Sequence, residues 1–472
     1  MNSMNHEGCC HAGFDNTIST DTLIALDLER ADINTMNIHN DGDGLTIDIE
    51  LNPRPHRCPV CSTETSRIKG YQNKIIRHSI LNNTPCIINY RARRYVCPFC
   101  GRTFLENNPF AYKGAKLSVA TVYNVLTDLK NPALTFSYVA SKYHISQSTV
   151  ANIFDRSVNI PRHPLPECIC FDETYAFKSE KSNYICVLVD YKSKKIIDIL
   201  PTRRLGDLTD YFFSIPLEER KNVKYVSYDM WQTYRSVANT MFPNCTPIVD
   251  KFHVLQEFTR KATKVRIRVM NKNKKIKDEL EAEAKKLKKE QMKLPPEKQE
   301  QLIEAKKNYY ILKKFEWMIF SKNKDILDPG KEKKMNHALG QYCNLYDLFT
   351  LLENTDEDMT EMINLKDELY DFYSNSTYEE AKTRINDFII HFRSSAVPEL
   401  VPFANTLTQW KPEIINSFII IPGINKKMNN ALIENRNKTI KLLKHSSNGY
   451  TCWKRFRNRV LFTINEDEKF KL

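Results

Sequence analysis

The spacing of hydrophobic and polar positions changes along this chain, and each pattern predicts a different kind of structure. Every second residue from Leu45 to Ile49 is apolar, which is typical of a strand or two with one buried face. Residues 117–160 contain no glycine and carry apolar side chains at helical spacing, so helices are expected there. From Glu167 onward the pattern is that of an α/β region. Its strands are expected at 168–171, 184–190, 195–200, 223–228 and 246–249.

A long helical segment follows these strands. Residues 251–392 are rich in Lys and Glu, and Pro295 and Pro296 interrupt the helical pattern as the turn of a hairpin would. The hairpin helices have too few apolar positions for a core of their own.

The distribution of charge separates two parts of the N-terminal region. The chain has 472 residues, of which 41% are hydrophobic, enough for two or three domains with their own cores. Its formal net charge is +13. Residues 1–50 hold ten acidic residues and one Arg, whereas residues 51–118 hold twelve Lys or Arg and two Glu. A basic module behind an acidic leader suits a polyanionic partner.

The sequence lacks the marks of secretion and of membrane insertion. The first 25 residues are polar and acidic, and the longest apolar run, residues 417–424, is far too short to span a bilayer. Thirteen cysteines are an odd number in a large chain, which indicates reduced thiols rather than a disulfide framework. The expected location is the cytoplasm, in association with the nucleoid.

Two Cys-x-x-Cys pairs lie 35 residues apart in the basic module. They are Cys58-Pro-Val-Cys61 and Cys97-Pro-Phe-Cys100. Each pair can supply two thiolates from one tight turn, and four thiolates form the tetrahedral site of a structural zinc. The alternative is two unrelated cysteine pairs. The separation is longer than in most zinc ribbons and leaves room for an inserted hairpin.

Two further groups of residues in the N-terminal region are weaker candidates for DNA or metal binding. Arg91, Arg93 and Arg94 precede the second pair, a pattern that suits contact with DNA phosphates or, alternatively, a solvated basic face. The acidic leader contains four residues of types that bind metals, although a leader without structure is the simpler interpretation. These residues are His6, Cys9, Cys10 and His11.

Residues 134–154 fit a helix-turn-helix. Val139 faces inward on the first helix, Ile145 fills the turn, and Ser146 can cap the second helix. A short helical hairpin without DNA contact is the alternative, and the preceding basic module favours DNA binding. The outward-facing polar residues of the second helix are of types that read base edges. They are Gln147, Ser148, Thr149 and Asn152.

Asp172 and Asp229 are the first two candidate catalytic carboxylates. Each follows an apolar predicted strand and is therefore held in place by the sheet, although either one alone could be a helix cap. Hard divalent cations take carboxylate oxygens as ligands, and two Mg²⁺ ions can serve both the attacking and the leaving oxygen of a phosphoryl transfer. A third acid would complete such a site.

Glu434 is the candidate third acid. On a helix over residues 428–443, it lies opposite the apolar side chains and in line with Lys438 and Lys441. A carboxylate in line with two lysines can hold a metal ion while the lysines bind DNA phosphates. The alternative is an ordinary Glu–Lys pair on a solvated helix face. Glu413 precedes this helix and is the competing third acid.

At these residues the chain resembles the bacterial insertion-sequence transposases of the ISL-three family, from the cysteine pairs to the C-terminus. The resemblance implies an RNase-H-like catalytic domain in which Asp172, Asp229 and Glu434 bind Mg²⁺ or Mn²⁺. It also implies a large helical insertion between the second and third acids. The hairpin of this insertion is expected to bind DNA ends or to pair subunits, or else to be a solvated hairpin without a role. The matching stretches are the cysteine pairs, the helix-turn-helix, and residues 171–178, 228–231, 248–254, 429–441, 449–450 and 456–459.

The same resemblance suggests an auxiliary role near the scissile phosphate for Asp250 and His253. A packed, hydrogen-bonded pair is the alternative. The fold expected for the whole chain is α/β, an RNase-H-like mixed sheet preceded by a zinc ribbon and a helix-turn-helix. The expected domains are 1–50 (acidic leader), 51–110 (zinc), 111–163 (helix-turn-helix) and 164–472 (catalytic, with an insertion at about 260–400).

The expected function is that of a DNA transposase, at least a dimer on double-stranded DNA. It would bind the terminal inverted repeats of its element, cut them, and join the freed 3′-hydroxyl to target DNA. Two alternatives stay open: a DNA-binding regulator whose catalysis is unused, and a nuclease of the same fold that does not join.

Overall fold

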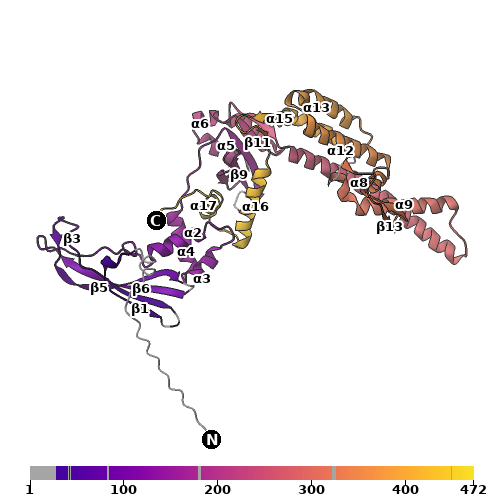
Figure 1. The fold of residues 1–472 in the computed structure, drawn as a ribbon. Helices are drawn as coiled ribbons and strands as arrows, with labels where there is room; N and C mark the ends of the chain where they lie inside the picture. The colour runs from indigo at the N-terminus through magenta and orange to yellow at the C-terminus, as the bar shows by residue number, and fades with distance from the viewer. Residues whose placement is uncertain are drawn as a thin grey trace, which may run out of the picture. The chain divides into compact units, whose positions relative to one another are not determined.

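A computed structural model describes residues 28–472 except 41, 43, 82–83, 179–181, 322–325 and 448. The chain forms two compact units, which can be followed by colour in Figure 1. The terminal unit comprises Met1–Pro161 and Leu442–Leu472, and the central unit comprises Arg162–Lys441. The candidate metal ligands of the leader, residues 6–11, lie outside the described residues.

A five-stranded sheet forms the first part of the terminal unit. Its order is β1-β2-β6-β5 with β7 on β6, and only the β2–β6 pair is parallel. Ile47, Ile88 and Tyr90 belong to its core. The strands are β1 (Ile33–Asn40), β2 (Leu45–Leu51), β5 (Ile68–Leu81), β6 (Thr84–Val96) and β7 (Thr103–Leu105), with η1 (Arg30–Asp32), β3 (His56–Arg57) and β4 (Glu64–Thr65) beside them.

This sheet revises the expected boundary of the acidic leader. The alternating residues Leu45 to Ile49 form a strand as predicted, but β2 pairs with β6 of the zinc module, so the folded domain includes residues before 51. The reason is that the backbone N–H and C=O groups along the edge of β2 need hydrogen-bond partners, and β6 of the long β5–β6 hairpin between the cysteine pairs provides them.

The helices described in the terminal unit, besides the end of α16 (Ala431–Ser446), are α2 (Val119–Asp128), α3 (Phe136–Lys142), α4 (Gln147–Ser157) and α17 (Trp453–Ile464). The side chains of Ser118, Thr135 and Ser146 accept hydrogen bonds from backbone amides three residues later, which fixes the starts of α2, α3 and α4. The predicted helix-turn-helix is therefore present as α3 and α4.

Helix α17 packs with these helices, although the sequence assigned it to the catalytic domain. Its Phe462 meets Phe154 of α4 edge to face, with ring centroids 5.9 Å apart. The buried Arg459 donates hydrogen bonds to the carbonyl oxygens of Asn131 and Leu134. Residues 442–472 thus belong to the unit that contains the helix-turn-helix, because the short helices α3 and α4 need α17 to cover their apolar faces.

A mixed sheet of order β10-β9-β8-β11-β12 forms the centre of the central unit. Strands β8, β9 and β10 are antiparallel neighbours, whereas β11 is parallel to both β8 and β12. Phe171 of β8 contacts Phe212 of α5 and Tyr234 of α7, so these helices cover one face. The elements are β8 (Cys168–Tyr175), β9 (Tyr184–Asp190), β10 (Ile196–Leu200), α5 (Leu205–Phe213), α6 (Leu217–Lys221), β11 (Tyr225–Tyr228), α7 (Gln232–Met241) and β12 (Thr246–Val249).

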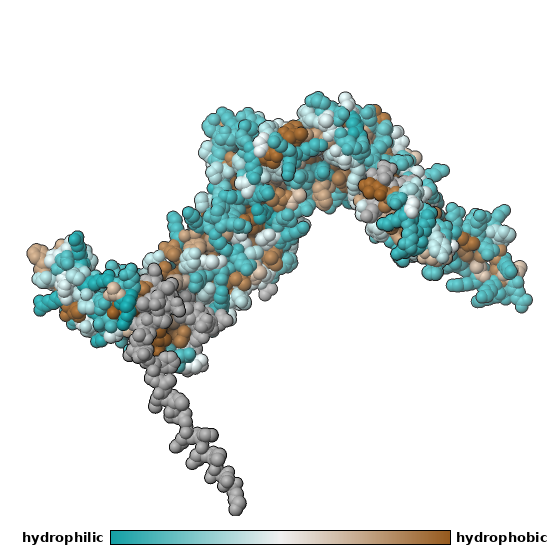
Figure 2. All heavy atoms as spheres, viewed as in Figure 1, coloured by the Kyte–Doolittle hydropathy of each residue, from teal (hydrophilic) through white to brown (hydrophobic). Residues whose placement is uncertain are grey.

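Helices α8 (Lys251–Lys289) and α9 (Pro296–Lys314) form the predicted hairpin around the two prolines. Ion pairs Lys298–Glu283 and Lys306–Glu281 join its outer part, which Figure 2 shows covered mainly by hydrophilic residues. The remaining elements of the central unit are α10 (Glu316–Ser321), β13 (Lys334–Asn336), β14 (Gln341–Cys343), α11 (Leu345–Glu353), α12 (Glu357–Asn375), α13 (Tyr378–Arg393), α14 (Val401–Gln409), α15 (Lys411–Asn416), β15 (Ile420–Ile421), β16 (Lys426–Lys427) and most of α16 (Ala431–Ser446).

The base of the hairpin differs from its outer part. Val265 and Val269 of α8 and Ile311 and Leu312 of α9 are fully or almost fully buried in the large core shared with the following helices. Within the described ranges, no helix combines the length and the apolar character needed to cross a bilayer.

Candidate active site, zinc site and DNA-binding surface

Strand register brings three aspartates to one edge of the central sheet. In the parallel pair of β8 and β11, Cys170 lies opposite Ser227. Asp172 is two residues further along β8, and Asp229 is the residue after β11, so both are directed to the same edge. Strands β11 and β12 are also parallel and in register, so Asp250 follows next to Asp229. Asp229 and Asp250 thus follow the carboxyl ends of their strands, whereas β8 continues to Tyr175, so Asp172 lies within its strand and not at its end as expected.

Two hydrogen bonds tie helix α16 to this edge. Ser227 Oγ donates to Asn430 Oδ1 just before the helix (2.8 Å), and Asn437 Nδ2 donates to Asp172 Oδ2 (2.8 Å). Glu434 is four residues after Asn430 and three before Asn437, so it lies on the same side of the helix. The side chain of Glu434 is exposed, as the helix-face argument predicted.

The remaining positions of α16 also follow the predicted amphipathic pattern. Ile433 and Ile440 are fully buried, whereas Lys438 and Lys441 are exposed. Burial raises the pKa of Asp250, and the negative charge of Glu434 raises it further. The third candidate acid is therefore within electrostatic reach of Asp250.

Burial of negative charge raises the pKa of the other two acids as well. Burial raises the pKa of Asp172 to about 6, although the backbone amide of Glu173 donates to its carboxylate (2.7 Å). Burial, with the charges of Glu173 and Asp172, raises the pKa of Asp229 to about 7. One carboxylate oxygen of Asp229 and one of Glu173 are buried without a hydrogen-bond partner.

This arrangement fits a divalent cation. Carboxylate oxygens are the preferred ligands of Mg²⁺, and a cation would compensate the buried negative charge whose burial raises the pKa of these groups. The three candidate acids are nevertheless not gathered tightly. Among the residues that the structure describes, the four cysteines of the zinc module are the one group of three or more His, Cys, Asp or Glu residues brought together for a metal ion.

The cysteine group has the geometry of a zinc site. The four Sγ atoms, of Cys58, Cys61, Cys97 and Cys100, lie within 4.8 Å of one another. The Cys61–Cys97 and Cys58–Cys100 separations are 3.5 and 3.6 Å. Thiolates around one zinc lie about 3.8 Å apart, given a Zn–S bond of about 2.3 Å. Gly101 closes the second turn with a φ of +69°, which glycine adopts readily.

Two known protein families match this chain, one over the zinc module and one over the region that contains the candidate acids. Residues 54–100 match the zinc-finger of transposase IS204/IS1001/IS1096/IS1165, and residues 169–460 match the ISL3 transposase family. The chain belongs to the ISL3 family of insertion-sequence transposases. It is similar to the transposase for insertion sequence element IS1001 from Bordetella parapertussis, at 20% identity over 411 residues, 86% of this chain and 89% of the relative. The family predicted from the motifs is confirmed.

The alternative third acid of the transposase has a different environment. Glu413 is 2% exposed, and both of its carboxylate oxygens accept hydrogen bonds from the guanidinium of Arg235, the longer at 2.8 Å. A carboxylate whose oxygens are both engaged by one arginine is occupied by a structural ion pair. This environment favours Glu434 over Glu413.

The auxiliary pair lies at the same sheet edge. Asp250 is 3% exposed and caps α8, its side chain accepting from the amide of Phe252 (3.3 Å). His253 is half-buried and close enough to Asp172 for its positive charge to counter part of the rise in the pKa of that acid. Asp250 therefore has a structural role as the cap of α8. A role of Asp250 and His253 in the reaction stays a prediction.

Sequence reasoning did not find several residues that shape this edge. Glu173 forms an ion pair with Arg203, whose guanidinium lies over the rings of Tyr184 (4.4 Å) and Trp231 (4.7 Å). Asn437, which holds Asp172, was also missed. Its position three residues after Glu434 was the available signal, because residues at that spacing share a helix face.

The prediction that Arg93 contacts DNA is wrong. Arg93 is 2% exposed, and its guanidinium pairs with Glu50 (2.7 Å) and Glu106 (3.5 Å). Pairing of β2 with β6 brings Glu50 against it, so Arg93 is part of the sheet's interior. Arg91 also reaches Glu50 and lies over the ring of Tyr71, although it is exposed to solvent, as is Arg94.

Helix α4, the predicted recognition helix, exposes most of the side chains that were predicted to read base edges. Gln147, Ser148 and Asn152 are exposed, as predicted. Thr149 is half-buried, and its hydroxyl lies 2.7 Å from Ser146 Oγ. Thr149 therefore supports the helix cap, and the residues left facing outward are the other three.

Proposed function

We propose that this transposase binds the ends of its element through the terminal unit and cuts and joins DNA at the sheet edge of the central unit. The observation that carries the proposal is the convergence of Asp172, Asp229 and the Glu434 helix at one edge. Strand order, parallel β11 and the two covering helices support an RNase-H-like fold for this unit, with α8–α15 as its helical insertion.

Asp172, Asp229 and Glu434 would hold two Mg²⁺ or Mn²⁺ ions. Such ions, when bound, activate an attacking oxygen and stabilise a leaving one. Asn437 keeps the Asp172 carboxylate oriented, since it donates to one of its oxygens (2.8 Å). Lys438 and Lys441 are exposed one and two turns after Glu434, where they can bind DNA phosphates. Asp250 and His253 would assist from the same edge.

The test compares single-charge variants of the full-length transposase with duplexes that carry the terminal repeats. Asp172→Asn, Asp229→Asn and Glu434→Gln keep the side-chain shape and remove the charge. Each should abolish cleavage and strand transfer in Mg²⁺ while leaving end binding intact, because binding resides in the other unit. Asp210→Asn, which removes an exposed carboxylate from α5, is the matched control and should retain activity.

The Glu413→Gln variant tests whether Glu434 or Glu413 is the third metal ligand. It should lower thermal stability, because Arg235 loses its buried counter-charge, but should still permit cleavage. An active Glu434→Gln protein beside an inactive, folded Glu413→Gln protein would move the third ligand to Glu413. Cleavage without joining by the unaltered protein would indicate a nuclease, and end binding without cleavage would indicate a regulator.

A further inference from the structure

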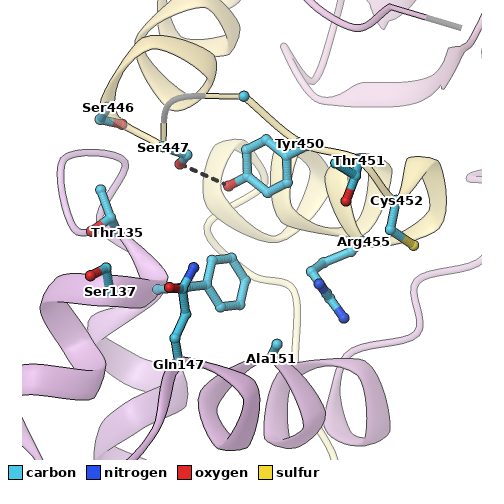
Figure 3. A pocket seen from close by; sticks show the side chains of 12 residues that line it. Thr135, Ser137, Gln147, Ala151, Ser446, Ser447, Tyr450, Thr451, Cys452 and Arg455 are labelled. Carbon is cyan, nitrogen blue, oxygen red and sulfur yellow. Dashed lines mark hydrogen bonds between the residues drawn. The ribbon is translucent and has the colours of Figure 1, made fainter.

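A polar cavity of about 590 Å³ lies within the terminal unit, between the helix-turn-helix and the residues that join α16 to α17. Figure 3 shows Thr135, Ser137 and Gln147 on one side of it, and Ser447, Tyr450, Thr451 and Arg455 on the other. The cavity is therefore lined by two segments that are far apart in the sequence, within residues 135–151 and 446–455. Its volume is in the range of sites that bind small ligands or parts of larger ones, roughly 300–1,000 Å³.

The lining favours an anion that accepts hydrogen bonds. None of the lining residues that the structure describes is Asp or Glu. Arg455 adds a cation, although Asp155, which does not line the cavity, pairs with it (2.7 Å). The hydroxyl groups of the lining each carry one hydrogen, and Ser446 already donates its hydrogen to the carbonyl oxygen of Leu442 (2.8 Å). The hydroxyl groups belong to Thr135, Ser137, Ser446, Ser447, Tyr450 and Thr451.

The same lining does not favour a stacked base. The ring of Tyr450 packs against Phe136 (centroids 6.3 Å apart) and Phe456 (5.0 Å), so its surface is engaged by protein. Its hydroxyl accepts a hydrogen bond from Ser447 Oγ (3.3 Å). Base binding in extended grooves relies on accessible aromatic faces, whereas hydroxyl groups, together with Arg and Lys, donate to DNA phosphates.

Gln147 belongs both to the cavity and to the helix that is expected to contact DNA. It is the first residue of α4, the helix expected to read base edges, and it also lines the cavity. DNA that lies against the start of α4 would pass the residues between α16 and α17. In helix-turn-helix complexes, contacts to the flanking backbone fix the register of the recognition helix.

We propose that Ser447 and Thr451, on either side of Tyr450, bind the phosphodiester backbone of the DNA that α4 reads. Thr451 donates to the backbone directly, and Ser447 exchanges its hydrogen bond to Tyr450 for one to a phosphate. The inference rests on the proposed end binding. It makes the DNA-binding surface discontinuous in sequence, with a backbone-positioning element from the C-terminal part of the chain beside the base-reading face of α4.

The test uses full-length transposase and fluorescence anisotropy with two labelled duplexes of equal length, one carrying the terminal repeat and one scrambled. Thr451 is exposed, so Thr451→Glu and Thr451→Gln should both fold, and they differ only in charge. Thr451→Glu should bind both duplexes about tenfold more weakly than Thr451→Gln, and the gap should narrow at high salt, because the repulsion is between exposed charges. Equal binding by the two variants would overturn the proposal.

A second pair of variants tests the hydroxyl groups. Ser447→Ala with Thr451→Ala should weaken binding to both duplexes by a similar factor, whereas Ser447→Thr with Thr451→Ser keeps the donors and should bind like the unaltered protein. A loss confined to the terminal-repeat duplex would mean base contact and would overturn the backbone assignment. If the unaltered protein itself does not prefer the terminal repeat, the proposed end binding fails instead.

Discussion

Truncation of Phe462 in α17 should destabilise the helix-turn-helix, although the two are some 300 residues apart in sequence. Phe462 is fully buried, its ring meets Phe154 of α4 and Phe470, and the Lys130 ammonium lies 5.2 Å from it. Phe462→Ala removes a buried ring and leaves a cavity, which costs about 3–5 kcal/mol. For a unit of this size the melting temperature should fall by about 6–20 °C, at about 2–4 °C per kcal/mol.

The measurement is calorimetry of the full-length protein, followed by DNA binding across the same temperature range. Binding to DNA should fail at the temperature at which the terminal unit unfolds, because Phe154 anchors the recognition helix. Phe213→Ala is the matched control, since Phe213 is 72% exposed on the central unit and its loss should change stability by about 0.5 kcal/mol or less. A Phe462→Ala transition no lower than that of the control would show that α17 does not belong to the helix-turn-helix core.

Three further predictions address the zinc, the recognition helix and the hairpin. Metal analysis should find one zinc per chain and less than half of that in Cys97→Ser; unchanged zinc in the variant would exclude the four-cysteine site. Gln147→Ala or Asn152→Ala should lower discrimination between terminal-repeat and scrambled DNA by about 1–3 kcal/mol, and equal losses on both would mean phosphate contact only. Replacing residues 276–304 with a short linker should leave the fold intact, because the buried base around Ile311 stays, but should reduce transposition. Normal transposition by that variant would show that the outer hairpin has no role.

Local signals in the sequence were sufficient for much of the architecture. The Ser146 cap and the apolar spacing around it predict α3 and α4, because a helix start depends on a few neighbouring residues. The cysteine spacing predicts the zinc site, since each pair closes its own turn. Asp229 could be placed at a strand end because a short apolar run identifies a buried strand, and helical spacing indicated Glu434. Asp172 was expected at a strand end too, but β8 continues beyond it, because pairing with β9 extends the strand past its apolar run.

Contacts between distant segments were decided only by the tertiary structure. Arg93 looks like its neighbour Arg94 in sequence, yet the pairing of β2 with β6 buries it against Glu50. The strand order that sets Asp250 beside Asp229 depends on hydrogen bonds between segments, which no local pattern records. Helix α17 completes the helix-turn-helix for the same reason: burial of an apolar face determines that some element must cover it, but the sequence of that face does not determine which one.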